Sequence, residues 1–454
     1  MLPRDLNIFS KWFSSRTRKP LVLRGARQVG KSTAVRLFAK AMGLKLIEIN
    51  LERFPHLDGV FKSLNVEQIL ATIESATGES IQKPNSLLFL DEVQSTPHAL
   101  AALRYLYEER PGLPIIAAGS LLEFVVSDHE FSMPVGRVEY AWMHPLSFSE
   151  FLTARGKIFL AEKLNALQPG EFWPDPQHHD LMFELRSYML VGGMPEVVQS
   201  YVTGGDEKEI QNLQDNIIAT YGDDFSKYAS GAALTRLQQA YRRLPQLCGK
   251  KIKFAEVLPH EKSANVKSVI ELLAKAGIVH RIYHSACDGL PLRAGIDFRV
   301  SKVYWLDCGL LNRMQGLTWH VWQQNKKLVY EGHLAEQFVA QELIATQKSS
   351  DPAPLCYWLR EGKSGNSEVD FVVQRGTDLV PIEVKSGASG SLKSLASFMQ
   401  YKKAKYAIKL GAGVPAVHAI SMKLSLADQT VDIQYTLDER PIYLAATVLL
   451  EPSS

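Results

Sequence analysis

The sequence predicts an α/β protein of several domains, the first of which is built on a parallel sheet. Three observations support this fold class. A glycine-rich loop lies between a short apolar strand and a helix, close to residue 25. A second apolar strand, at residues 86–90, ends in two acids. A helix, three strands, a helix and a further strand follow one another in the last third of the chain.

The glycine-rich loop fits G-x-x-x-x-G-K-[ST], the pattern of phosphate-binding loops (P-loops) in nucleotide triphosphatases. Its residues are Gly25, Ala26, Arg27, Gln28, Val29, Gly30, Lys31 and Ser32, and Thr33 follows at the start of the helix. The glycines let the backbone curl so that its N–H groups face an anion, and the helix N-terminus adds partial positive charge. We therefore expect these nine residues to bind ATP, with Lys31 reaching the β- and γ-phosphates and Ser32 binding Mg²⁺.

Two further strands are expected to complete this site. Four apolar residues followed by Asp91 and Glu92 are typical of a buried parallel strand that ends in carboxylates. We expect Asp91 to hold Mg²⁺ and Glu92 to polarise the attacking water as a general base. The apolar strand at residues 113–118 precedes Ser120. Ser120 either senses the γ-phosphate or caps a helix over residues 121–126.

With two later motifs, this region resembles a known group of ATPases. The motifs are Gly136-Arg137 and Pro145-Leu146-Ser147-Phe148-Ser149-Glu150-Phe151. Together with the P-loop and the Asp-Glu strand, they resemble prokaryotic archaeal-type ATPases of the AAA+ and signal-transducing superclass. The resemblance implies an AAA+-like domain over residues 1–155 and a possible homo-oligomer. It makes Arg137 the candidate γ-phosphate arginine, acting in cis or across a subunit interface; the alternative is a surface arginine in a loop.

The middle of the chain is predicted to contain a helical region and a winged helix. Residues 156–230 are expected to be a linker and helices, with a proline-interrupted loop over 160–179. The resemblance extends to Gly192-Gly193-Met194-Pro195-Glu196, where the glycines are expected to permit a tight turn. Residues 231–320 end in an amphipathic helix and two strands, the layout of a winged helix. Basic residues on its helix and wing either contact DNA phosphates or solvate a protein-docking face: Lys262, Lys267, Lys275, Arg281, Arg293, Arg299 and Lys302.

Residues 325–454 are predicted to form a restriction-endonuclease-like domain of the PD-(D/E)xK type. Asp370 and Glu383 are expected to lie side by side on adjacent strands, where they could hold Mg²⁺ against a scissile phosphate. Glu336, on the preceding helix, is expected to support this metal from outside. Lys385, two residues after Glu383, points to the same face and could stabilise charge on the phosphate. The alternative is a retained fold that binds a partner without cutting, and Ser386–Ser391 is expected to be a flexible loop beside the site.

Composition sets few limits on the partners. A net charge of +3 neither requires nor excludes nucleic acid. The four cysteines lack metal-ligand spacing, which favours reduced thiols in a cytoplasmic protein. There is no apolar run of signal-peptide or membrane-spanning length, so no membrane partner is expected.

Two functions are compatible with these features. In the first, an ATP-hydrolysing domain couples its nucleotide state to a DNA-binding and Mg²⁺-dependent DNA-cleaving C-terminal region. In the second, the protein is a nucleotide-dependent switch or scaffold whose nuclease-like domain only binds a partner. The intact set of Lys31, Asp91 and Glu92 favours ATP hydrolysis in both cases.

Overall fold

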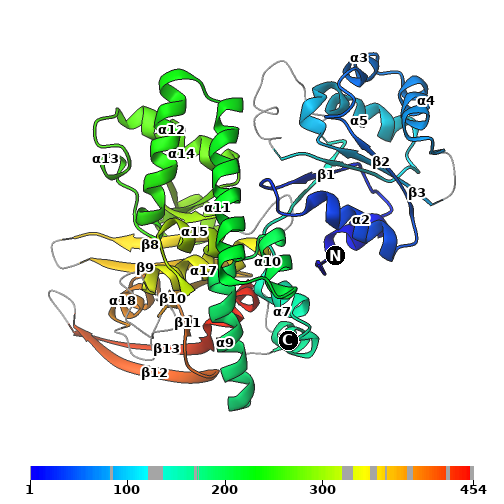
Figure 1. The fold of residues 1–454 in the computed structure, drawn as a ribbon. Coiled ribbons are helices and arrows are strands. Elements are labelled where there is room, and N and C mark those ends of the chain that lie inside the picture. The colour runs from blue at the N-terminus through cyan, green and yellow to red at the C-terminus, as the bar shows by residue number, and fades with distance from the viewer. Residues whose placement is uncertain are drawn as a thin grey trace. The chain divides into compact units, whose positions relative to one another are not determined.

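The structure is a computed structural model that describes most of the chain in two compact units (Figure 1). It describes residues 2–81, 85–120, 136–167, 171, 173–319, 331–347, 355–362, 366–385, 392–425 and 430–449. Unit 1 comprises residues 1–145, 272–278 and 348–352, and unit 2 comprises residues 146–271, 279–347 and 353–454. The helix expected over 121–126 and the loop expected over 386–391 lie outside the described residues. The bounds of the four predicted domains stay predictions.

Unit 1 is built on a parallel five-stranded sheet in the order β2-β3-β4-β1-β5. The strands are β1 (Leu21–Arg24), β2 (Lys45–Asn50), β3 (Ser86–Asp91), β4 (Ile115–Ala118) and β5 (Glu139–Trp142). The helices are α1 (Asn7–Ser14), α2 (Lys31–Ala41), α3 (Leu57–Lys62), α4 (Val66–Thr77) and α5 (Pro97–Glu109). Every residue of β3 and β4 is buried, which explains why these strands read as continuous apolar runs.

The order of these strands determines where functional residues gather. β3 and β1 both pair with β4, and all three strands run in the same direction. Their carboxyl ends therefore lie at one edge of the sheet, which is where ligands bind in open α/β sheets. The apolar core beside them includes Leu88 and Leu90 of β3, Ala117 of β4 and Leu103 of α5, all of which are fully buried.

Unit 2 contains an eight-stranded mixed sheet in the order β12-β13-β11-β10-β9-β8-β6-β7. The strands are β6 (Val279–Ser285), β7 (Ile296–Trp305), β8 (Leu355–Arg360), β9 (Ser367–Arg375), β10 (Asp378–Val384), β11 (Tyr406–Gly411), β12 (Ala416–Ser425) and β13 (Thr430–Pro441). The helices are α7 (Phe148–Ala154), α8 (Ile158–Ala166), α9 (Asp175–Val191), α10 (Pro195–Val202), α11 (Glu207–Asp224), α12 (Gly231–Arg243), α13 (Phe254–Val257), α14 (Ser263–Lys275, whose last turn clusters with unit 1), α15 (Cys308–Met314), α17 (Glu331–Ala345) and α18 (Lys393–Lys402).

The C-terminal elements follow the predicted order. α17, β8, β9, β10, α18 and β11 come in succession, with β8, β9 and β10 antiparallel and β11 parallel to β10. Two long strands extend this core beyond the elements predicted from the sequence, because β12 and β13 pair antiparallel over ten residue pairs. The proline-interrupted stretch at 160–179 is also more helical than predicted, since α8 and α9 cover much of it.

The predicted wing does not form a separate sheet. β6 and β7 are an antiparallel ribbon that follows α12, α13 and α14, the order expected for a winged helix. However, β6 also pairs in parallel with β8, with Tyr283 opposite Cys356 and His284 opposite Tyr357. The ribbon is therefore one edge of the sheet that also contains β8, β9, β10 and β11.

The Gly192-Gly193 turn is tight, as predicted, and it is fixed by a buried acid. Gly192 has φ +79°, and a Cβ there would lie 2.1 Å from Oδ1 of Asp307. The Gly193 N–H donates to Oδ2 of Asp307 at 2.6 Å, and its carbonyl accepts the N–H of Leu146 at 2.7 Å. Side chains at either glycine would therefore displace the backbone that holds unit 2 together here.

Candidate functional site

The P-loop leaves β1 and enters α2 through three residues with positive φ. Gly25 has φ +135°, Gln28 has φ +62° and Gly30 has φ +89°. A Cβ on Gly25 would lie 2.2 Å from the carbonyl oxygen of Met143, so only glycine fits there. Gly30 is the N-cap of α2, which directs the free N–H groups of the helix toward the loop. The local backbone is thus shaped for an anion.

Lys31 is held inside this loop. Its ammonium donates to the carbonyls of Gly25 at 2.9 Å and Ala26 at 2.7 Å. Burial lowers the pKa of Lys31 to about 8, although the nearby carboxylates of Glu92 and Asp91 oppose the shift. A bound polyphosphate would offer the ammonium anionic oxygens in place of these neutral carbonyls.

The two acids predicted to complete the site end β3 beside the loop. The Ser32 hydroxyl donates to Oδ2 of Asp91 at 2.9 Å, so the two predicted Mg²⁺ ligands are neighbours. Burial raises the pKa of Asp91, and the hydrogen bond from Ser32 opposes that rise. Glu92 has φ +53°, which is unusual for a non-glycine residue, and its carboxylate accepts a short hydrogen bond from the Gln94 amide. Sequence reasoning missed Gln94.

Two arginines connect the P-loop to neighbouring segments. Arg27 donates from Nε to Oγ of Ser120 at 3.1 Å, so the structure places Ser120 next to the loop. Arg4, near the N-terminus, donates to the carbonyls of Val29 at 3.0 Å and His144 at 2.9 Å. No motif in the sequence identified Arg4, because its contacts lie 25 and 140 residues away.

The structure corrects one of the two roles expected for Arg137. Arg137 precedes β5, which runs parallel to β1 with Glu139 opposite Leu21. The P-loop follows the carboxyl end of β1, whereas Arg137 lies beside the amino end of that strand. The length of β1, about 13 Å, therefore separates Arg137 from the P-loop. Its Nε pairs with Oε1 of Glu108 at 2.7 Å, and its side chain is 45% exposed. Action in cis is therefore wrong, whereas action across a subunit interface stays a prediction.

A second group of charged side chains gathers on β9, β10 and α17 in unit 2. The backbone N–H of Val384 donates to Oδ2 of Asp370 at 2.8 Å, which places Asp370 beside Glu383. Lys385 donates to Oε1 of Glu383 at 2.6 Å, while Oε2 of Glu383 is buried without a hydrogen-bond partner in the described part of the chain. Burial, together with the charges of Glu336 and Glu383, raises the pKa of Asp370. An unpartnered buried oxygen beside a second carboxylate fits a cation between Asp370 and Glu383.

Glu336 lies in the same group of charged side chains, but its carboxylate forms hydrogen bonds with two residues of β7. Its Oε2 accepts hydrogen bonds from Tyr304 at 3.1 Å and from Lys302 at 3.4 Å. Against the effect of burial, Lys302 lowers the pKa of Glu336. Among the described residues, no three His, Cys, Asp or Glu side chains are arranged to hold a metal ion. The metal-binding roles expected for Asp370 and Glu383, and the outer support expected from Glu336, stay predictions.

Two of the basic residues predicted on the wing cannot contact DNA phosphates. Lys302 is 1% exposed and pairs with carboxylates inside unit 2. Arg281 has a side chain that is 9% exposed and donates to Oγ of Ser301 at 3.3 Å. They lie on opposite faces of the β6–β7 ribbon, because Arg281 pairs with Val303 and Lys302 with Ile282, and each is covered on its own face. Lys267 and Lys275 on α14, and Lys262 just before it, are exposed, as their proposed role requires.

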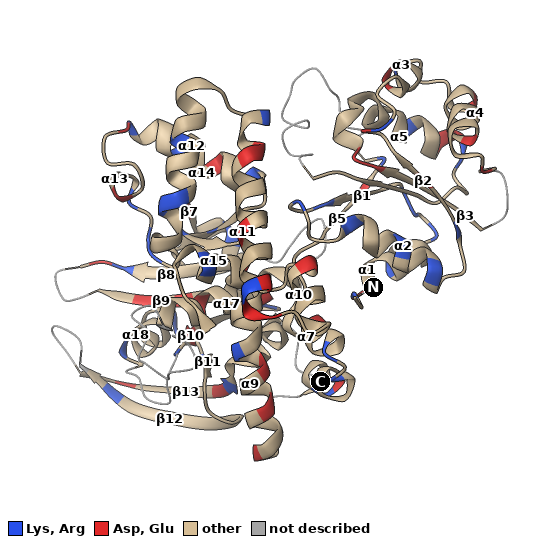
Figure 2. Ribbon diagram, in the orientation of Figure 1, with Lys and Arg blue, Asp and Glu red and all other residues tan. Residues whose placement is uncertain are grey.

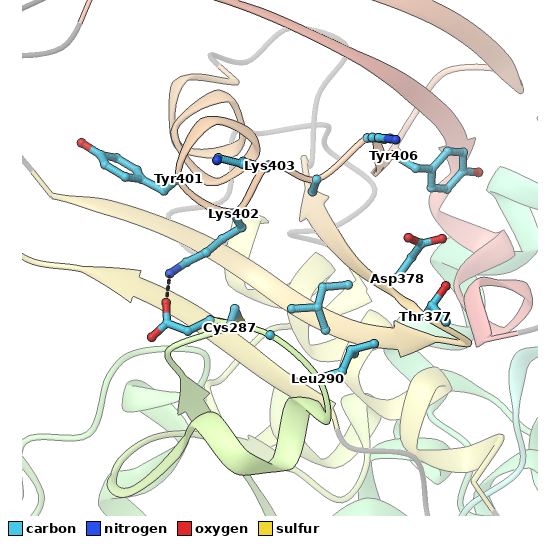
Figure 3. A pocket seen from close by; sticks show the side chains of 13 residues that line it. Cys287, Leu290, Thr377, Asp378, Tyr401, Lys402, Lys403 and Tyr406 are labelled. Atoms are coloured by element: carbon cyan, nitrogen blue, oxygen red, sulfur yellow. Dashed lines mark hydrogen bonds and ion pairs between the residues drawn. The ribbon is translucent and has the colours of Figure 1, made fainter.

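A cavity of about 520 Å³ lies at the other end of β10 from Glu383, where β10 begins. Figure 3 shows its walls, which come from the loop after β6, the β9–β10 turn and the end of α18. Lys402 points toward the first of these and pairs with Asp288 at 2.6 Å. Lys403 and Lys405 are exposed, and within the described ranges neither side chain meets a carboxylate. Tyr401 and Tyr406 line the same cavity as these lysines, and Figure 3 shows both tyrosines with Lys403.

Comparison with known families identifies the first domain. Residues 17–152 match the family described as an AAA domain. Residues 182–320 and 331–430 match two domains of unknown function, DUF8612 and DUF4143. No curated protein matches the chain. From this match, the motif and the strand order, the chain contains an AAA-type P-loop ATPase domain, and such a domain binds nucleotide.

Several solved structures align weakly with the chain. AMPPCP-bound DnaA from Aquifex aeolicus is 15% identical, with 59% of this chain and 85% of that chain covered and a TM-score of 0.27. The Thermotoga maritima RuvB Holliday junction branch migration motor is 14% identical, with 60% and 72% covered and a TM-score of 0.24. PCH-2 from C. elegans is 12% identical, with 59% and 64% covered and a TM-score of 0.22. At these TM-scores the similarities carry no argument.

Two remaining observations concern the cysteines and membranes. Cys248, Cys287, Cys308 and Cys356 are free and buried. Within the described ranges, no helix has the length and apolar character needed to span a bilayer.

Proposed function

We propose that this protein is a Mg²⁺-dependent ATPase whose nucleotide state controls its C-terminal unit. The observation that carries the proposal is the convergence of Lys31, Ser32, Asp91 and Glu92 at one edge of the unit 1 sheet. Lys31 would bind the β- and γ-phosphates, and Ser32 and Asp91 would hold Mg²⁺, which neutralises charge on the phosphates. Glu92, oriented by Gln94, would accept a proton from the attacking water.

Two predicted residues would complete the ATPase site. Ser120 would respond to the γ-phosphate, since Arg27 of the P-loop already contacts its hydroxyl. Arg137 would act on the nucleotide of a neighbouring subunit, because strand direction keeps it away from its own P-loop. This role requires a homo-oligomer in which the exposed Arg137 exchanges Glu108 for the phosphate of the neighbour.

A short connector supports coupling between the nucleotide and unit 2. Within unit 1, the Met143 carbonyl oxygen is in close contact with the backbone of Gly25. Only His144 and Pro145 separate Met143 from Leu146, which is anchored within unit 2 by Gly193 and by the Tyr188 hydroxyl at 2.5 Å. Two residues later, the Phe148 N–H donates to Glu342 of α17 at 3.0 Å. A P-loop movement on nucleotide binding would therefore be passed along the chain to the helix that also carries Glu336.

We propose DNA as the ligand of unit 2. Figure 2 shows Lys and Arg interspersed with Asp and Glu, so a DNA-binding face must be local. Lys403 and Lys405, which line one cavity with Tyr401 and Tyr406, are such a local group. Lysines contact phosphates and aromatic rings stack on bases, a combination typical of nucleic-acid binding.

Cleavage of that DNA at Asp370, Glu383 and Lys385 is the finer form of the proposal. Asp370 and Glu383 would hold Mg²⁺, which would polarise the scissile phosphate, and Lys385 would stabilise the negative charge that develops on it. The second candidate is a switch that binds DNA or a protein without cutting. It is favoured by the ion pair that Lys302 forms with Asp370 and by its pair with the neighbouring Glu336.

The rate of ATP turnover with and without DNA tests the coupling. We expect Mg²⁺-dependent turnover that DNA stimulates and that Lys31→Ala abolishes while circular dichroism shows an intact fold. Undiminished turnover in Lys31→Ala would remove the ATPase proposal. Turnover that DNA leaves unchanged would favour the switch with a protein partner.

The charge-reversed double variant Lys403→Glu/Lys405→Glu tests the DNA-binding surface. We expect weaker retention on duplex or single-stranded DNA and a salt dependence whose logarithmic slope falls by about 2. Lys40→Glu/Lys62→Glu, at two exposed lysines of unit 1, is the matched control for overall charge. Equal losses in the double variant and the control would argue against this surface.

Cleavage is tested on linear, nicked and single-stranded DNA with ATP and Mg²⁺ or Mn²⁺. Asp370→Ala and Lys385→Ala should eliminate any cut that the wild type makes. If the wild type cuts none of these substrates, the nuclease form of the proposal fails for them.

A further inference from the structure

Lys302 is a buried cation within the carboxylate group of the nuclease-like site. Its side chain is 1% exposed. Its Nζ lies 2.5 Å from Oε1 of Glu368, 3.4 Å from Oε2 of Glu336 and 3.9 Å from Oδ1 of Asp370. The Tyr357 ring lies 5.3 Å from the same Nζ, which adds a cation–π contact. An ammonium with these partners is fixed in place, because withdrawing it would leave buried carboxylates unpaired.

This cation comes from outside the predicted nuclease core. Lys302 belongs to β7, and β7 joins the core sheet only through β6 and its pairing with β8. Tyr304, two residues further along β7, projects from the same face and donates to the same oxygen of Glu336. Two side chains of the ribbon therefore hold Glu336, which the sequence alone had placed in support of a metal.

The positions of these charges leave room for one metal ion. Paired divalent ions in phosphate-cleaving sites lie about 3.5–4 Å apart and share carboxylates. Nζ of Lys302 occupies the space between Glu336 and Asp370, where a second ion would bind. Glu383 carries the unpartnered oxygen, and the N–H of its neighbour Val384 donates to Oδ2 of Asp370, whereas Lys302 faces Oδ1. The four carboxylates Glu336, Glu368, Asp370 and Glu383, with the ammonium groups of Lys302 and Lys385, leave two negative charges, which one divalent cation balances.

We propose that Lys302 takes the place of a second divalent ion in this site, so that the site binds a single divalent cation between Asp370 and Glu383. The inference rests on the metal-binding part of the proposed nuclease function. It makes Lys302 a positioning residue, since it acts through Glu336 and Asp370 and not on the substrate. It also assigns the β6–β7 ribbon a direct contribution to the nuclease-like site.

Mn²⁺ binding to the full-length, nucleotide-free protein tests this inference. Free Mn²⁺ is measured by electron paramagnetic resonance, which gives the number of bound ions. The number bound at this site is the number bound by each protein minus the number bound by the same protein with Asp370→Asn. We expect a difference of one ion for the wild type, one for Lys302→Arg and two for Lys302→Met. A difference of two ions or none for the wild type, or of one for Lys302→Met, would overturn the inference.

Two controls keep the test decisive. If circular dichroism shows that Lys302→Met does not fold, Lys302→Gln replaces it. The number of Mn²⁺ ions bound by the wild type still decides between one ion and two. ATP turnover is measured on the same preparations, because the P-loop lies in the other unit. A count of zero with normal ATP turnover refutes the metal site alone, whereas absent turnover with a count of one refutes the ATPase proposal alone.

Discussion

The affinity for ATP is expected to fall at alkaline pH because of a single side chain. Burial lowers the pKa of Lys31 to about 8 in the nucleotide-free protein. The phosphates of ATP favour the charged ammonium, so ATP binds the protonated form and raises the pKa of Lys31 in the complex. As pH rises through the free-protein pKa, a growing fraction of Lys31 must take up a proton before ATP can bind. The dissociation constant for ATP should therefore rise with pH.

The magnitude follows from that pKa. At pH 7 nearly all of Lys31 is charged, whereas at pH 9 only about a tenth is, so ATP should bind about tenfold more weakly at pH 9. That factor corresponds to about 1.4 kcal/mol of binding free energy. Above pH 8 the slope should approach one decade per pH unit, and below about pH 7.5 it should be flat.

The assay is titration calorimetry with Mg²⁺ and a non-hydrolysable ATP analogue, so that Glu92, whose charge affects the pKa of Lys31, stays in place. Lys31→Arg is the matched control, because a guanidinium stays charged throughout this range. Its dissociation constant should be weaker overall but independent of pH. A wild-type dissociation constant that changes less than twofold between pH 7 and 9, or an equal slope in Lys31→Arg, would refute the reasoning.

Three other perturbations have expected outcomes. Lys302→Met should destabilise unit 2 by about 3–5 kcal/mol in urea unfolding, since it unpairs buried carboxylates. Glu368→Gln, at a partner of Lys302 that is 37% exposed, should cost under about 1 kcal/mol. Similar losses of stability in the two variants would argue against a buried cluster. Gly193→Ala should prevent unit 2 from folding, as judged by circular dichroism, because its Cβ would lie 2.2 Å from the Leu146 carbonyl oxygen. Gly222→Ala, in α11 with open space around it, should instead stabilise the protein by about 0.5–1 kcal/mol. Gln94→Ala should lower kcat for ATP about 10- to 100-fold through misplacement of Glu92 while the ATP dissociation constant stays unchanged; an unchanged kcat would show that Gln94 does not orient Glu92.

The sequence was sufficient to locate the P-loop and the acids beside it. The P-loop is a local motif, and a buried parallel strand brings its terminal acid to the same sheet edge as the loop. The contact between Ser32 and Asp91 agrees with that expectation, and the catalytic roles of these residues stay predictions. Arg137 shows the limit of the motif, because its reach depends on strand direction, which a resemblance in sequence does not measure.

The contribution of Lys302 could not be predicted in the same way. Its role depends on the pairing of β6 with β8, and about 70 residues of sequence separate these two strands. A partial signal was present, since Lys302 stands in an apolar strand, and a lone lysine there needs a buried counter-charge. A clearer signal was overlooked in β13, where Val431, Ile433, Tyr435 and Leu437 alternate with other residues as a half-buried strand requires.

The pairing of β6 with β8 also determines how this chain can be divided. The two regions of unknown function meet between residues 320 and 331, which by sequence suggests a convenient boundary for truncation. A fragment that ended there would keep the β6–β7 ribbon but expose the N–H and C=O groups of β6 that pair with β8. Such unpaired edges recruit strands from other molecules and cause aggregation. The complementary fragment would contain Glu336 and Asp370 without the ammonium of Lys302. The two matched regions thus share one sheet in this protein, and they would have to be expressed and purified together.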